Sequence, residues 1–499
     1  MKPSAHPTHP AHAFPTFMPH PVTHHLPCPR RLVLTVLAAS VLGGCAISEP
    51  VLRPTMSLSA SWSEPADTSA ASIPDTWWQS FGSPQLDALI AEAMLAAPDL
   101  LIQGERVVQA ELALRQSGAS LLPTLSLAGS SGVRNIEGNE TGASELGLAA
   151  AYEIDLWGRL AASVDASRAR LAATRFDYAA ARLSLSASVS SLWFQSLALE
   201  DRLAIARNNL SIAESVLRVV QARYDNGAAS ALELSQQRST VLAQRQAIEP
   251  LAVQLRQTRS ALAILLGRGP QARFIEGERL AELSLPTIAT GLPSELLWRR
   301  PELAASEAGL VAAAADIAAA RAALLPSISL SAGAGIASGA LLALADNTRT
   351  LSISASVLQK IFDGGRLKAD VDLQRSRQRE LLEAHRSNIL TALKEVEDAL
   401  ANGARDRRQE AVQREILAEA QRSLSLAELR YREGADSLLA VLDAQRTLFA
   451  AQDQMAQLRL ARLTAAVNLY KALGGGWQNA LALQPDLDKN ALPAPAAQR

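Results

Sequence analysis

Apolar and small polar residues alternate along four short segments of the chain. In SELGLAAAYEIDLW, for example, Leu146, Leu148 and Tyr152 fall on one side of an extended chain. Glu145 and Glu153 fall on the other side. A period of two places one class of side chain on each face of a β-strand. The alternation predicts strands over about residues 123–134, 144–156, 326–337 and 349–361.

Long helical stretches follow each pair of predicted strands. Neither glycine nor proline occurs between Gly158 and Gly227, and Gly403 alone interrupts the stretch from Gly365 to Gly434. A helix over the first stretch would be about 100 Å long at ~1.5 Å per residue. A helix of that length needs a packing partner along all of it. We expect helices over residues 158–225, 229–266, 365–432 and 436–473.

The last predicted helix carries a heptad repeat. Val441, Leu448 and Leu469 share one heptad position, with Arg462 as an exception, and a row beginning at Ala444 lies three residues later. Apolar residues at these two positions predict a coiled-coil seam. Packing on a globular core would explain one such helix, but it is a poor explanation for four.

The whole pattern occurs twice. LLPTLSLAGSSG, which contains Pro123, is repeated by LLPSISLSAGAG, which contains Pro326, 203 residues later. Gly365 follows Gly158 by 207 residues, and RYREGADSLL repeats RYDNGAASAL, which begins at Arg223, with the same offset. The self-similarity predicts a tandem repeat with one slip of four residues. We divide the chain into a leader (1–44), an N-terminal segment (45–83), a first repeat (84–267), a linker (268–294), a second repeat (295–474) and a tail (475–499).

Composition supports closely packed helices and gives no sign of catalysis. Hydrophobic residues make up 48% of the chain but aromatic residues only 4%, and 48 basic residues balance 49 acidic ones. No nucleic-acid partner is therefore expected. The chain lacks HExxH, GxxxxGK[ST] and CxxC motifs, so we expect no enzyme, no cofactor and no metal site. We interpret the glycines from Gly333 to Gly339 as a loop at a strand end, and His385 as a surface residue of a helix.

The N-terminus has the pattern of a bacterial export signal. Arg30 and Arg31 precede an apolar stretch that is too short to span a membrane, although Met18 is an alternative start. The sequence LGGC ending at Cys45 resembles a lipobox, in which the cysteine is acylated. Because Cys28 lies before the predicted cut, Cys45 has no partner for a disulfide in the mature chain. An ordinary signal peptide with a chance cysteine is the alternative.

The predicted strands have the length of tilted membrane strands, about ten residues each. Four strands cannot close a barrel, because single-chain barrels begin at eight. An open sheet edge in lipid would leave backbone amides without partners. If these strands enter a membrane, several chains must share one barrel, and three chains would supply twelve strands.

Three stretches together resemble the TolC-like outer membrane factors, in particular the lipoprotein branch of resistance-nodulation-division efflux systems (OprM- or NodT-type). They are WWQSFGSPQLDALIAEA from Trp77, GLPSELLWRRPEL from Gly291 and YREGADSLLAVLDAQRTLFAAQ from Tyr431. With the lipobox, the resemblance spans essentially the whole mature chain. It implies a mainly α protein with long coiled-coil helices forming a periplasmic α-barrel.

The same resemblance implies a homotrimer with a twelve-stranded β-barrel, lipid-anchored in the outer membrane of a Gram-negative bacterium. The implied function is a passive exit duct for drugs or other small molecules. A periplasmic adaptor and an inner-membrane pump would be its partners. A coiled-coil adaptor lipoprotein without a pore, or a duct for type I protein secretion, are the alternatives. Two pairs of membrane-length strands argue against the first alternative.

The resemblance also identifies candidate residues for closing the periplasmic end. Asp443 matches an aspartate of the family's constriction, and Tyr431 matches a tyrosine of its closing network. Asp436 stands where the best-known member has an arginine, so that ion pair does not carry over. Tyr224 and Glu233 are weaker candidates at the equivalent places of the first repeat. A solvated coiled-coil position is the alternative for Asp443.

Glycine and proline mark the expected turns. Gly227 and Gly434 follow the long helices closely, and glycine suits the left-handed conformation after a helix end. We expect them at hairpin tips near the docking surface for the adaptor. The expected junctions between helices and strands are Pro123, Pro326, Gly158 and Gly365.

Overall fold

The computed structural model describes residues 48–65, 73–136, 139–274, 277–339 and 348–477. The chain divides into two units, Met1–Ala46 and Ile47–Arg499, and all the described residues belong to the second. The predicted leader and Cys45 lie outside the described residues, as does most of the predicted tail.

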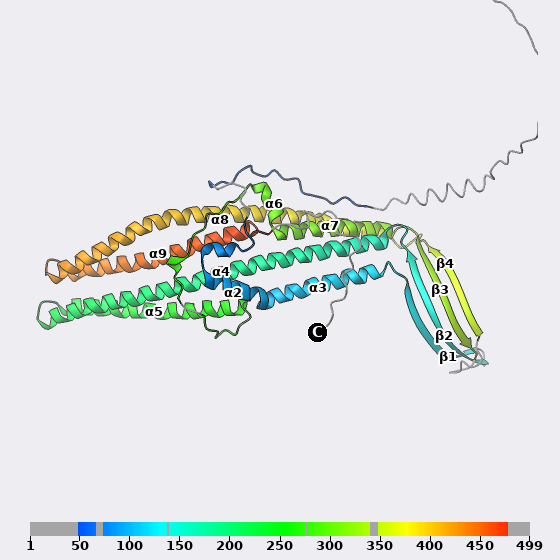
Figure 1. Ribbon diagram of the computed structural model, residues 1–499, viewed down its shortest axis with the longest axis horizontal. Helices are drawn as coiled ribbons and strands as arrows, with labels where there is room; N and C mark the ends of the chain where they lie inside the picture. Colours follow the sequence, from blue (N-terminus) through cyan, green and yellow to red (C-terminus); the bar gives the residue numbers. More distant parts are fainter. Residues whose placement is uncertain (1–47, 66–72, 137–138, 275–276, 340–347, 478–499) are drawn as a thin grey trace, which may run out of the picture. The chain divides into compact units, whose positions relative to one another are not determined.

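Each repeat contains a medium helix, a β-hairpin, a very long helix and a returning helix (Figure 1). The two longest helices have 67 residues each, which gives about 100 Å. The first repeat holds α2 (Pro84–Ala96), α3 (Pro98–Ala119), β1 (Thr124–Ile136), β2 (Asn139–Ile154), α4 (Arg159–Asp225) and α5 (Ala231–Leu265). The second holds α6 (Leu296–Arg299), α7 (Pro301–Ala322), β3 (Ser327–Ser338), β4 (Thr348–Leu358), α8 (Arg366–Arg432) and α9 (Leu438–Ala472). Short 3₁₀ turns are η1 (Trp77–Phe81), η2 (Leu280–Glu282) and η3 (Pro293–Glu295).

The helix boundaries follow from proline and glycine. Pro98 and Pro301 begin α3 and α7, where the missing N–H would have no partner inside the helix. Gly158 and Gly365 precede α4 and α8 with φ of 73° and 84°, a left-handed conformation that glycine adopts readily. The chain passes from α3 to β1 through Pro123 and from α7 to β3 through Pro326.

The helices pack as antiparallel pairs, α4 with α5 and α8 with α9, and α4 also contacts α9 (Figure 1). The predicted seam is confirmed, because Val441, Ala444, Leu448 and Leu469 of α9 are buried. Its polar exception is also explained, since the Arg462 guanidinium forms an ion pair with the buried Glu410 of α8. A charge in the seam is thus tolerated because its partner lies in the facing helix.

An aromatic cluster joins the start of the described fold to its end. The rings of Trp77 and Tyr470 stack with centroids 5.1 Å apart, and Phe81 packs edge-on against Phe194, with centroids 4.9 Å apart. All four side chains belong to one buried core shared by η1, α4 and α9. Of the described helices, α7 is long and apolar enough to cross a membrane, but 56% of its most apolar window is buried. It packs against both α4 and α8, as a core helix does.

The four strands form one antiparallel sheet in the order β1-β2-β3-β4. Leu127, Leu351 and Ile353 expose their side chains on one face. On the other face, Ser329 and Ser356 hydrogen-bond across β3 and β4 with oxygens 2.7 Å apart. The sheet therefore has an apolar face and a face of small polar residues, as the alternation predicts.

Two minor predictions are wrong. Most of the glycine segment lies inside β3 rather than in a loop, and a Cβ on Gly335 would come within 2.9 Å of the Leu146 carbonyl oxygen of β2. The glycine permits close backbone approach. His385 is half-buried rather than exposed, and its Nδ1 lies 2.7 Å from Ser306 Oγ. Burial lowers the pKa of His385, with Glu307 opposing this effect.

Candidate gate at the hairpin tips

The two helical hairpins end in the same turn. Gly227 and Gly434 have φ of 73° and 74°, and their amides donate to the carbonyl oxygens of Tyr224 (2.9 Å) and Tyr431 (3.1 Å). Each glycine thus closes the last helical turn in a left-handed conformation. The tips lie at the same end of α4, α5, α8 and α9 (Figure 1).

Tyr431 is the buried centre of the tip region. Its side chain is 3% exposed and packs with Val220 and Leu438 in an apolar cluster. Its hydroxyl has no hydrogen-bond partner among the described residues. Burial raises the pKa of the Tyr431 hydroxyl, Glu233 raises it further, and Arg223 opposes both. A buried phenol without a partner is costly, so a rearrangement that gave it a partner would be favoured.

Arg223 connects the two repeats at this point. Its Nη1 donates to the Tyr431 carbonyl oxygen (2.6 Å), and its guanidinium carbon lies 4.7 Å from the centre of the Tyr431 ring. A guanidinium over an aromatic face is a cation–π contact. Arg223 is not among the gate residues predicted from the sequence. The signal was available, because Arg223 and Arg430 are repeat equivalents that each precede a tyrosine.

The equivalent arginine of the second repeat has a different partner. Arg430 Nε donates to Asp436 Oδ2 (3.2 Å), and the other Asp436 oxygen accepts from the amide of Ser437 (2.8 Å). The Ser437 hydrogen bond, followed by Arg430, holds the pKa of Asp436 below its usual range. Both Asp436 oxygens are thus engaged within its own hairpin, and the structure does not bring Asp436 together with Tyr431.

Asp443 lies on the exposed side of α9. Its side chain is 61% exposed, and it forms an ion pair with Arg446, whose Nη1 lies 3.5 Å from Oδ1. Pairs spaced i, i+3 on an exposed helix contribute little stability. The carboxylate is therefore accessible to other molecules, and it is not part of the Tyr431 contact network.

The two weaker candidates differ in environment. The Tyr224 side chain is 41% exposed, in contrast to its buried equivalent Tyr431. Glu233 forms a capping box with Ser230: its Oε2 accepts from the Ser230 amide (2.7 Å), and its own amide donates to Ser230 Oγ (3.2 Å). Glu233 thus has a local role at the start of α5.

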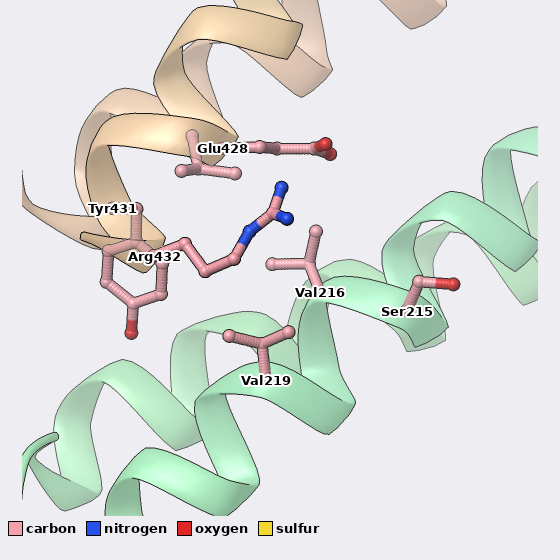
Figure 2. A pocket seen from close by; sticks show the side chains of 7 residues that line it. Ser215, Val216, Val219, Glu428, Tyr431 and Arg432 are labelled. Carbon is pink, nitrogen blue, oxygen red and sulfur yellow. The ribbon is translucent and has the colours of Figure 1, made fainter. Parts of the chain in front are cut away.

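A small cavity of about 160 Å³ separates α4 from α8 near Tyr431. Figure 2 shows Val216 and Val219 of α4 facing Glu428 and Arg432 of α8 across it. Burial raises the pKa of Glu428, with Arg432 opposing this effect. The contact between the hairpins therefore includes a space that neighbouring side chains could fill on rearrangement.

Within the described ranges, no group of three or more histidine, cysteine, aspartate or glutamate side chains could hold a metal ion.

Known proteins of one family resemble this chain over nearly its full length. The model of the outer membrane efflux protein family matches residues 89–268 and 292–475, one segment in each repeat. The pyoverdine export outer membrane protein OpmQ of Pseudomonas putida (strain KT2440) is 41% identical over 466 residues, which cover 90% of this chain and 98% of that protein. The cation efflux system protein CusC of Escherichia coli (strain K12) is 32% identical and covers 89% of this chain and 99% of its own length.

Solved structures have the same fold. A crystal structure of CusC superposes with a TM-score of 0.77 at 31% identity, covering 86% of this chain and all of that one. A membrane protein from Pseudomonas aeruginosa gives a TM-score of 0.79 at 32% identity with the same coverage. The chain belongs to the outer membrane efflux protein family.

Proposed function

We propose that this chain and two further copies form the outer-membrane exit duct of a tripartite efflux pump. Each chain supplies its four strands to a twelve-stranded barrel and its long helices to a periplasmic tunnel. The duct conducts passively, and we assign no catalytic activity to the chain. A periplasmic adaptor and an inner-membrane pump complete the assembly, and the pump supplies the energy.

The amphipathic sheet with two open edges is the observation that carries this proposal. Exposed Leu127, Leu351 and Ile353 suit lipid, and the serine-rich face suits a water-filled lumen. Among the described residues, β1 and β4 each have a strand on one side only. Because unpaired backbone groups are not tolerated in lipid, further copies must pair with both edges. A coiled-coil lipoprotein without a pore would have no use for such a sheet.

The N-terminal segment supports a lipid anchor at Cys45. Glu49 forms an ion pair with Arg321 (2.6 Å), six residues before the start of β3, and Arg53 forms one with Glu307 (2.8 Å) nearer the start of α7. The segment thus runs along α7 toward the sheet. Glu49 follows Cys45 by four positions in the sequence, and an extended residue spans at most ~3.6 Å. The direction of the described segment therefore agrees with an acyl anchor on Cys45 in the outer membrane.

We further propose that the hairpin tips form the closed periplasmic end of the duct. Tyr431, held by Arg223, supports the contact between neighbouring hairpins within a chain. Exposed Asp443 carboxylates from three chains would narrow the passage and attract cations. The turns at Gly227 and Gly434 are the proposed docking surface for the adaptor.

We propose that the duct exports small molecules. Relatives at 41% identity are named for pyoverdine export, so pyoverdine-type compounds are the first candidates. Other relatives are named for toluene or cation efflux. A deletion strain compared with its parent for secreted pyoverdine-type compounds and for susceptibility to a panel of toxic compounds would identify the class. Loss of a secreted protein without either change would instead favour the type I secretion duct.

The proposed assembly is tested in outer-membrane fractions. We expect a band of trimer size that shifts to monomer on heating, and discrete conductance steps in planar bilayers. A soluble monomer without conductance would overturn the duct. Metabolic labelling with palmitate tests the anchor separately: Cys45→Ser should abolish the label, and the matched control Cys28→Ser should retain it.

A further inference from the structure

The two hairpins of the sheet share one strand register. Thr124 lies opposite Ala151 in β1 and β2, and Ser327 lies opposite Leu358 in β3 and β4. Ser327 follows Thr124 by 203 residues, and Leu358 follows Ala151 by 207. These offsets also relate the two sequence repeats. β3 is therefore the structural copy of β1, and β4 is the structural copy of β2.

The pairing between the two hairpins predicts the pairing between chains. In the β2–β3 pair, Ala149 lies opposite Gly333. The repeat equivalents of these residues are Ser356 on β4 and Ser130 on β1, the two edge strands. In the proposed barrel β4 of each chain pairs antiparallel with β1 of a second copy, and we propose that the register of this pairing places Ser356 opposite Ser130 of the neighbouring copy. This register rests on the proposed duct, whose barrel it closes.

The side-chain pattern agrees with this register, which was derived from the repeat offsets alone. Ile353 falls opposite Val133 of the neighbouring copy, so that apolar residues meet on the lipid face. Ser356 and Ser130 both belong to the small polar face. A shift of one residue would bring the two faces into opposition. The register thus keeps both faces continuous around the ring.

The proposed register also gives a partner to Ile361, one of the most exposed apolar side chains among the described residues. Ile361 and Phe362, just after β4, are 89% and 91% exposed. The repeat equivalent of Ile361 is Ile154, which pairs with Ile328 at the end of β2. Its proposed partner is therefore Leu125 of the neighbouring copy, and β4 would extend by three residues to Ile361 in the assembly.

The helices next to these edges favour the same partner. α7 packs between α4 and α8, whereas its repeat equivalent α3 packs on α4. Leu101, Ile102 and Leu112 of α3 remain exposed. α3 leads into β1, and α8 follows β4. When β4 of one chain pairs with β1 of a second copy, α8 of the first chain therefore approaches the apolar face of α3 in the second copy. Repetition of this head-to-tail contact closes a ring.

One bond of the junction inside the chain has no counterpart between chains. Trp157 Nε1 donates to the Pro326 carbonyl oxygen (2.7 Å) where β2 meets β3. The repeat equivalent of Trp157 is Gly364, which has no side-chain donor. The register between chains therefore depends on the strands themselves, which makes it accessible to a scan along β1.

Disulfide formation in the outer membrane tests the register. Ser356→Cys is combined in turn with Ala128→Cys, Ser130→Cys and Gly132→Cys, which share one face and are spaced ~6.8 Å apart. A disulfide needs Cβ atoms ~3.5–4.5 Å apart. We expect the Ser130 combination to give covalent dimers and trimers at least fivefold more abundantly than the other two. Ala355→Cys with Ser131→Cys tests the adjacent pair, which has the other hydrogen-bonding geometry.

The outcomes distinguish a failure of the proposed register from a failure of the proposed duct. Stronger cross-linking at Ala128 or Gly132 would overturn the register while leaving the trimer. Absence of all cross-links in a protein that still migrates as a heat-modifiable trimer would overturn the edge pairing. Absence of the trimer itself in the unsubstituted protein would overturn the proposed duct. Cys45 is present in every variant, so Ser356→Cys alone measures background disulfides.

Discussion

The guanidinium of Arg223 lies over the ring of Tyr431, 4.7 Å from its centre, and donates to the carbonyl oxygen of the same residue. The two residues come from different repeats and different hairpins. Tyr431 is buried at this point, so the contact fixes the end of α4 against the end of α8. In the proposed duct it is a bond that must rearrange if the tips separate.

Replacing Arg223 should therefore favour the open duct. Arg223→Gln removes the cation–π contact and the charged hydrogen bond, together about 2 kcal/mol, or roughly a 30-fold shift in populations. We expect more frequent open events and a larger mean conductance in planar bilayers. Arg238→Gln is the matched control, because Arg238 of α5 is exposed and bonds Gln221 of its own hairpin (3.0 Å). Equal conductance of both variants would contradict the role of Arg223.

The fold could be predicted from the sequence because its signals are periodic and local. The strand alternation, the seam through Val441 and Leu448, and the turns at Gly227 and Gly434 all depend on residues close in sequence. The offsets of the repeat extend these local signals over the whole chain. The Arg223–Tyr431 contact joins positions 208 residues apart, and no local pattern specifies such a pair.

Local hydrogen bonds explain why the roles of Glu233 and Asp436 are harder to predict from the sequence. Glu233 and Asp436 sit at helix starts, where short-range backbone amides satisfy their carboxylates. A carboxylate at such a position is stabilised by the helix end itself. The residue type alone therefore fits a gate residue and a helix cap equally well, and only the folded structure identifies its hydrogen-bond partner.

Removing the exposed carboxylate of α9 should widen and neutralise the proposed constriction. Asp443→Ala should raise single-channel conductance and weaken block by divalent cations, because three negative charges are lost near the axis. Glu419→Ala on α8 is the matched control, since Glu419 is also exposed and also has an i, i+3 arginine at 3.5 Å. Unchanged conductance and block in Asp443→Ala would remove this residue from the gate.

The cavity beside Tyr431 predicts a pH-dependent stability. The pKa of Glu428 is raised by burial, so its ionised form disfavours the folded hairpins and this penalty disappears as pH falls below the folded pKa. Glu428→Gln should therefore raise the melting temperature at pH 7, and the difference from the parent should shrink as pH falls through the raised folded pKa and be absent below the unfolded value of ~4.5. Glu433→Gln, at the exposed end of the same helix, should change neither value. An equal effect at both pH values would exclude titration of Glu428 as the cause.

The ion pair in the α8–α9 seam predicts a larger loss of stability. Glu410 is 3% exposed and accepts hydrogen bonds from Arg462 and Arg414. Glu410→Gln leaves the Arg462 charge half-buried without its partner, at a cost of about 3 kcal/mol. Thermal melting followed by circular dichroism should show a clear drop, whereas exposed Glu415→Gln should not. Glu410→Leu combined with Arg462→Leu should restore much of the loss, because apolar residues suit the seam.

The ion pairs of Glu410 also predict how stability depends on pH in acid. Burial alone would raise the pKa of Glu410, but the hydrogen bonds from Arg462 and Arg414 outweigh burial and lower it. A depressed carboxyl pKa contributes stability above the unfolded value of 4.5, and this contribution is lost as pH falls from there through the folded pKa. The melting temperature of the parent should therefore decline below pH ~4.5, and Glu410→Gln should decline less steeply. Parallel curves for the two proteins would show that other carboxylates dominate the acid response.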